Sequence, residues 1–161
     1  TVTLGGTISG NVSNGAFMSP GSILGTLTVQ GNLTLLGTAQ LWMDIGGTAQ
    51  GSTHDFLTVS GTVTFGGDLA LNLVNGAEGT LLPTDNLTLL SAASVSGSFN
   101  NVANGGRLLT TNGVSSFQVN FTGTSIVLSQ FAAIPEPSTW VLMMAGLGGV
   151  AIMTYRRRAR P

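Results

Sequence analysis

A glycine-centred unit, apolar–x–Gly–x–apolar, recurs between residues 8 and 99 and limits what this chain can fold into more than any other feature. A glycine between two short apolar runs lets the backbone turn a corner without interference from a Cβ atom. Such corners can stack, and repeats of about two to three dozen residues are typical of solenoids. The units are Ile8-Ser9-Gly10-Asn11-Val12, Val29-Gln30-Gly31-Asn32-Leu33, Val59-Ser60-Gly61-Thr62-Val63 and Val95-Ser96-Gly97-Ser98-Phe99, with glycines 21, 30 and 36 residues apart.

The same region consists of short strand-like runs separated by glycine and asparagine turn signals. The clearest alternation is Leu69-Ala70-Leu71-Asn72-Leu73, and no stretch with helical periodicity occurs before residue 134. We therefore expect residues 1–131 to form an all-β domain, with a parallel β-solenoid as the favoured architecture. The uneven spacing of the glycines leaves a β-sandwich as the alternative.

Charge is scarce in this chain. Charged residues make up 7% of it, against about 25% in an average soluble domain. Before residue 135 the sequence contains one cation, Arg107, and five carboxylates, so this region has a formal net charge of −4. A nucleic-acid-binding surface needs a basic patch to neutralise phosphates, which excludes that class. The acids are Asp44, Asp55, Asp68, Glu78 and Asp85.

The chain contains no cysteine, so it carries neither a disulfide framework nor a thiolate metal site. This favours a bacterial envelope protein with a repetitive β core over a small disulfide-rich secreted domain. The chain starts at Thr1 without an initiator methionine or an apolar leader, which we interpret as a removed signal peptide or a fragment. We expect no cofactor.

The composition changes at Ala132. Residues 132–139 form a linker in which Pro135 and Pro137 keep the chain extended on both sides of Glu136. Residues 140–155 carry no charge and are bracketed by Trp140 and Tyr155, where interfacial aromatic residues are expected. We predict a transmembrane helix over these sixteen residues. Its length would be about 24 Å, which is short for a hydrocarbon core of about 30 Å.

Residues 156–161 form an arginine-rich tail. The positive-inside rule places this tail in the cytoplasm and the β domain on the other side of the membrane. Moving one arginine to the bilayer centre costs about 2.5–3.5 kcal/mol, so the cluster is expected to act as a cytoplasmic stop. The arginines are Arg156, Arg157, Arg158 and Arg160.

Pro135-Glu136-Pro137, a short apolar helix and a terminal arginine cluster together resemble the PEP-CTERM sorting signal, over about residues 134–160. The resemblance implies recognition of Pro135, Glu136 and Pro137 by an exosortase, an integral-membrane cysteine protease that releases or transfers the protein outward. It further implies a retention helix at 140–155 and a Gram-negative host that makes exopolysaccharide and biofilm. The alternative is a plain membrane anchor that follows a proline linker.

The β region has a second resemblance, to the repeats of autotransporter passenger domains. The segments that resemble them are Gly25 to Asn32 and Asp55 to Gly61, after Ser19-Pro20-Gly21-Ser22. This resemblance implies a right-handed parallel β-helix. The sequence lacks the translocator barrel of an autotransporter, so only the architecture is implied.

No strong catalytic motif is present. His54 lies in a loop, and we interpret it as part of a solvated turn in which Asp55 caps backbone amides. A nucleophile elbow of the form Gly-x-Ser-x-Gly is absent. The nearest segment, Gly113 to Phe117, contains Ser115 and Ser116 but lacks the second glycine. We therefore assign no catalytic residue and expect that the protein is not an enzyme.

Two further hypotheses concern ligands. Asp44, Asp55 and Asp68 could stack on neighbouring coils as a calcium site, with Arg107 acting on an acidic sugar, but scattered aspartates are more often turn formers. We therefore assign no metal site. Trp42, between Leu41 and Met43, could stack on a sugar, although we expect a buried strand tryptophan.

The sequence thus indicates an exported surface or extracellular-matrix protein, structural or adhesive in a biofilm context. Its expected partners are the exosortase, the inner membrane during transit and exopolysaccharide. The alternative is a secreted carbohydrate-binding module or polysaccharide-active enzyme with the same tail.

Overall fold

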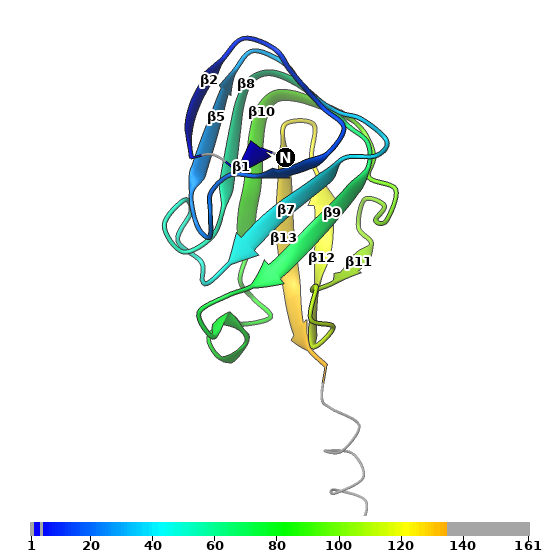
Figure 1. The fold of residues 1–161 in the computed structure, drawn as a ribbon. Helices are drawn as coiled ribbons and strands as arrows, with labels where there is room; N and C mark the ends of the chain where they lie inside the picture. Colours follow the sequence, from blue (N-terminus) through cyan, green and yellow to red (C-terminus); the bar gives the residue numbers. More distant parts are fainter. Residues whose placement is uncertain (1, 4, 135–161) are drawn as a thin grey trace, which may run out of the picture.

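A computed structural model describes residues 2–3 and 5–134 and shows two β-sheets that enclose one core (Figure 1). The sorting motif, the predicted transmembrane helix at 140–155 and the arginine tail lie outside the described residues. Within the described part, no helix is long and apolar enough to cross a membrane. The elements are β1 (Val2–Thr3), β2 (Gly6–Ser9), β3 (Val12–Asn14), β4 (Phe17–Ser19), β5 (Thr26–Gln30), β6 (Leu33–Leu35), β7 (Gln40–Ile45), β8 (Phe56–Phe65), β9 (Asp68–Leu73), the 3-10 turn η1 (Ala77–Gly79), β10 (Leu87–Gly97), β11 (Arg107–Leu109), β12 (Ser115–Phe121) and β13 (Ser125–Ala133).

The first part of the chain forms parallel ladders. The smaller sheet has the order β1-β4-β7-β9, and all of its pairs are parallel. In the larger sheet β2, β5, β8 and β10 also pair in parallel, with β3 and β6 beside them. Figure 1 shows these strands nested, each lying along the one before it. Leu27, Leu57 and Leu90 are register partners and are fully buried, because alternate residues face the core.

Three of the four glycine-centred units lie at one corner of these ladders. Ile8 pairs with Val29, and Val29 pairs with Val59. An asparagine ladder closes the corner, because the Asn32 amide donates to Asn11 Oδ1 and the Thr62 amide donates to Asn32 Oδ1, both at 2.8 Å. These side-chain acceptors satisfy amides at the point where the strands bend.

The fourth unit does not occupy this corner. Gly97 pairs with Phe65 rather than with Gly61, and the residue opposite Thr62 is Ser94. The register shifts between Ala92 and Ser94. The four units are therefore not equivalent in the fold: β10 passes the first corner without a glycine and has Gly97 at its C-terminal end.

The last part of the chain is antiparallel. β10 pairs with β13, β13 with β12 and β12 with β11, all in antiparallel orientation. Residues 122–124 alone join β12 to β13, and a connection this short cannot make the crossover that a parallel pair requires. The all-β prediction is confirmed. The larger sheet is mixed, so the structure does not show a parallel solenoid over the whole of residues 1–131.

The antiparallel strands complete the core that the parallel strands begin. Phe117, Val119, Ile126 and Leu128 are fully buried in the same apolar cluster as the leucines of β5 and β8. At the corner after β8, Phe65 and Phe99 stack with ring centroids 4.6 Å apart, and Phe121 packs against both rings. The C-terminal hairpin therefore covers apolar surface that the parallel strands would otherwise leave exposed.

Candidate functional site

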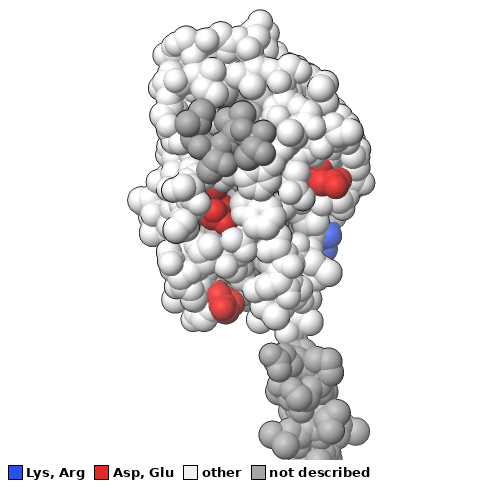
Figure 2. Space-filling model, in the orientation of Figure 1, with Lys and Arg blue, Asp and Glu red and all other residues white. Residues whose placement is uncertain are grey.

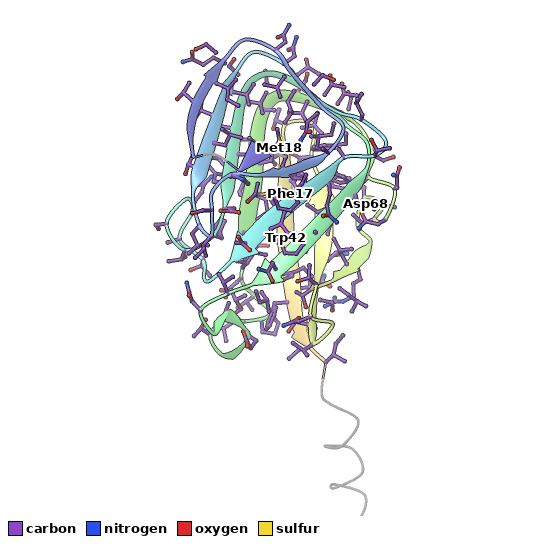
Figure 3. All side chains as sticks on the ribbon, in the orientation of Figure 1. Phe17, Met18, Trp42 and Asp68 are labelled. Carbon is purple, nitrogen blue, oxygen red and sulfur yellow. The ribbon has the colours of Figure 1, made fainter. Side chains whose placement is uncertain are left out.

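The outer face of the smaller sheet carries the most distinctive group of side chains among the described residues. In β7 the buried Leu41 and Met43 face the core, so Trp42 and Asp44 face outward. Figure 3 shows Trp42 and Phe17 beside each other on this face, with Asp68 nearer its edge. Trp42 is half-buried. The expectation of a buried tryptophan is wrong, because its two neighbours take the inward positions of the pleat.

Two neighbours, Asp44 and Phe17, hold the Trp42 ring in place, and Asn72 in turn holds Asp44. Trp42 Nε1 donates to Asp44 Oδ1 at 3.0 Å, and Asn72 Nδ2 donates to the same oxygen at 2.6 Å. The Phe17 ring lies 5.8 Å from Trp42, tilted by 42°. Asn72 is itself fixed, because its Oδ1 accepts a hydrogen bond of 3.0 Å from Thr111 Oγ1. The indole is therefore a rigid, partly exposed platform.

The sequence pattern singles out Trp42 but not Phe17 and Asn72, which lie 25 residues before it and 30 residues after it. The three residues come together because β4, β7 and β9 are neighbours in the sheet. The signal that could have indicated Asn72 was present, since it occupies an outward position of the clearest alternating strand. Its partner in the register, Asp44, could not be read from the sequence.

Asp55 lies beneath this face and is completely buried. Its Oδ1 accepts the Gly25 amide at 2.8 Å, and its Oδ2 accepts the Asp44 amide at 2.9 Å. Burial raises the pKa of Asp55 from 3.8 to about 6, and the nearby Asp44 carboxylate adds to this rise. The two amide bonds and the Ser19 hydroxyl oppose the rise in pKa. Capping by Asp55 is confirmed, but the predicted solvated turn is wrong, because its carboxylate is enclosed.

His54 is also buried, with 1% of its surface exposed. Its Nδ1 lies 3.1 Å from the Gly47 carbonyl oxygen, and its Nε2 lies 3.1 Å from the Thr88 carbonyl oxygen. Both ring nitrogens therefore face main-chain oxygens, and the ring ties the loop before β8 to β10. In this arrangement His54 has no hydroxyl to activate, so the geometry supports a structural role.

The other candidate residues are dispersed. Asp68 pairs with Gln40 across β9 and β7, whereas Asp55 lies in the interior, so the three aspartates do not converge. No group of three or more His, Asp or Glu in residues 2–3 and 5–134 is placed to hold a metal ion. Arg107 donates from Nε to Ser116 Oγ at 3.0 Å and from Nη2 to the Gln130 carbonyl oxygen at 2.7 Å. Ser115 is fully buried.

The buried carboxyl predicts how stability depends on pH. The folded protein holds the Asp55 proton more tightly than the unfolded chain does, so the free energy of unfolding should fall as pH rises from about 4 to about 6. Two pKa units correspond to about 3 kcal/mol, which is the upper limit of this contribution. Urea denaturation of the full chain, followed by circular dichroism between pH 4 and 7.5, measures the effect.

Asp55→Asn is the matched variant. It should abolish this pH dependence and should also lower stability at every pH, because an amide NH₂ would face one of the two backbone N–H donors. A pH dependence that survives in Asp55→Asn would contradict the assignment to Asp55.

A family model for the PEP-CTERM protein-sorting motif matches residues 133–158. The chain carries a PEP-CTERM protein-sorting motif at its C-terminal end. No curated protein and no solved structure matches it, so the resemblance to autotransporter passengers gains no support. The PEP-CTERM match includes Pro135, Glu136 and Pro137, and it extends from Ala133, the last residue of β13. A PEP-CTERM signal marks an exported, membrane-anchored protein of the cell envelope that an exosortase processes.

Proposed function

We propose that the β domain of this PEP-CTERM protein is a structural or adhesive component of the cell surface or extracellular matrix, in a biofilm or exopolysaccharide setting. The sorting motif directly follows β13, and this observation carries the proposal. The match therefore attaches export and surface processing to the β domain itself.

The outer surface of the β domain supports a structural role. Hydroxyl and amide side chains pair across neighbouring parallel strands: Ser9 with Gln30 at 2.9 Å and Thr62 with Ser94 at 2.8 Å. Thr64 and Ser96 make a similar contact at 3.3 Å. Such uncharged rows hydrogen-bond well to water and to hydroxyl-rich polymers. The parallel register of β2, β5, β8 and β10 also supports a solenoid-like arrangement of the first part of the domain.

A second candidate function is that of a secreted carbohydrate-binding module. The rigid, half-buried Trp42 with carboxylate and amide neighbours favours it. A polysaccharide-active enzyme is less well supported, because the buried Asp55 and His54 are both engaged with the main chain. Non-enzymatic function accordingly forms part of the proposal.

In the membrane, we propose that residues 140–155 span the bilayer before processing, with Arg156, Arg157, Arg158 and Arg160 in the cytoplasm and the β domain outside. The distribution of arginine in the sequence supports this orientation. The proposed transit ends when the exosortase cuts near Pro135-Glu136-Pro137.

Mass spectrometry of the protein released from cells tests the export and the processing on which the proposed function depends. We expect a mature C-terminus near Pro135-Glu136-Pro137 and no peptide from residues 140–161. Released protein that ends at Pro161 would contradict processing, and protein found only in the cytoplasm would contradict export.

A further inference from the structure

The outward side chains of the smaller sheet form one continuous group, which we call the Trp42 face. Its residues are register partners across neighbouring strands: Phe17 pairs with Gln40, Gln40 with Asp68, and Asp44 with Asn72. Outward neighbours lie about 4.8 Å apart across strands and about 6.6 Å apart along a strand, which is the scale of a single sugar ring. The members of the Trp42 face are Phe17, Gln40, Trp42, Asp44, Asp68, Asn72 and Ala70, the register partner of Trp42.

We propose that the Trp42 face binds an uncharged polysaccharide, with one hexose ring stacked on Trp42. This inference deepens the proposed surface function by naming the ligand class. The aliphatic C–H face of a hexose carries weak positive charge and meets the negative π face of an indole, while its ring hydroxyls point sideways. A half-buried indole that is already fixed loses little conformational freedom when it binds.

Hydrogen-bonding groups surround the indole at the places where the hydroxyls of a stacked ring would lie. Asp44 is buried, with 5% of its surface exposed; its Oδ1 accepts from Trp42 and Asn72, whereas its Oδ2 makes no hydrogen bond within the described part of the chain. Gln40 is exposed and Asp68 is half-buried, and they are register partners. A carboxylate and an amide at such positions accept and donate to vicinal hydroxyls. The combination of an aromatic platform with a few placed polar groups is typical of small-molecule sites.

Charge decides which polysaccharides fit. The Trp42 face contains Asp44 and Asp68 and no cation. Figure 2 shows this side of the molecule as mostly uncharged, with scattered acidic groups and one basic group at its right edge. Arg107 lies on β11 of the larger sheet, where its guanidinium group donates to Ser116 and Gln130, and it is not a member of the Trp42 face. A polymer of uronic acids would meet like charges, so the face should select neutral chains.

Isothermal titration of the purified full chain with cellohexaose, dextran and polygalacturonate tests this inference. We expect saturable binding of at least one neutral probe and none of polygalacturonate. Trp42→Ala should weaken the neutral binding about tenfold or more, while Trp42→Phe should retain part of it. Trp140→Ala is the matched control, because it removes the other tryptophan and should leave binding unchanged.

Asp44→Asn is a second variant that keeps an oxygen acceptor for Trp42 Nε1. It should reduce neutral binding, because an NH₂ donor replaces the Oδ2 acceptor, and it should weaken the discrimination against polygalacturonate, because it removes a like charge. Circular dichroism shows whether each variant is folded. The inference is overturned if neither neutral probe binds, if folded Trp42→Ala binds as tightly as the parent protein, or if polygalacturonate binds better. Because the C-terminus of released protein is measured separately, failure of sugar binding leaves the processing result intact, and the reverse also holds.

Discussion

Glu136→Ala should leave the protein uncleaved and held in the inner membrane, and replacing both Pro135 and Pro137 by alanine should have the same result. The PEP-CTERM match places these residues in the segment that the exosortase reads. Proline fixes its own backbone φ angle and disfavours helical backbone at the preceding residue, and alanine at both positions would remove these restrictions. We expect released protein to fall to the background of an exosortase-deficient strain, measured by immunoblots of medium and membrane fractions.

Matched controls lie in the β domain. Glu78→Ala removes an exposed carboxylate from η1, and Pro83→Ala removes an exposed proline. Both variants should be processed like the parent protein, because neither residue belongs to the sorting motif. Normal release of Glu136→Ala and of the double proline variant would refute the role assigned to Pro135-Glu136-Pro137.

Gly67→Ala should prevent stable folding of the β domain. Gly67 has φ +67°, and a Cβ atom there would lie 2.7 Å from the Ala39 carbonyl carbon and still closer to its oxygen. Neither backbone segment can move freely, because the Asp68 amide donates to the Ala39 carbonyl oxygen at 2.8 Å. The Asn100 amide also donates to the Gly67 carbonyl oxygen at 2.6 Å. A clash between two hydrogen-bonded segments should cost more than about 4 kcal/mol.

Gly105→Ala separates the clash from the cost of the backbone conformation. Gly105 has φ +75°, and a Cβ atom there would meet nothing within 4 Å. The free energy of unfolding of this variant should fall by only about 1–2 kcal/mol, which is the cost of a non-glycine residue in left-handed backbone, and the protein should remain folded. Urea denaturation of both variants gives the comparison. Equal losses of stability would show that contact with Ala39 is not the cause.

Asp55 shows why the sequence predicted that a carboxylate caps backbone amides but not that this carboxylate is buried. An aspartate that caps backbone amides was predicted for Asp55, because a short carboxylate before a strand commonly does so. Its two partners, Gly25 and Asp44, lie 30 and 11 residues away. Those contacts exist only after neighbouring parallel strands have paired, and the same pairing buries the carboxylate.

The fourth glycine unit shows the same limit. Gly97 has the local pattern of Gly10, Gly31 and Gly61, yet β10 carries it to a different corner. Local pattern specifies that a glycine allows a turn, whereas the length and register of the preceding strand specify where that turn lies. The bulge between Ala92 and Ser94 changes the offset between β10 and β8 only from 33 to 32 residues, whereas Gly97 lies 36 residues after Gly61, so the length of β10 before Gly97 is what separates the two corners.

The sequence by itself determined the all-β class and the sorting signal, because both depend on local patterns: alternation with glycine turns in one case, and a short ordered motif in the other. Only the tertiary structure decided that the last strands are antiparallel, that Asp55 and His54 are enclosed, and that Trp42 faces outward beside Phe17 and Asn72. These features depend on which distant strands become neighbours and in what register, and that choice is made by burial of the shared core rather than by any single segment.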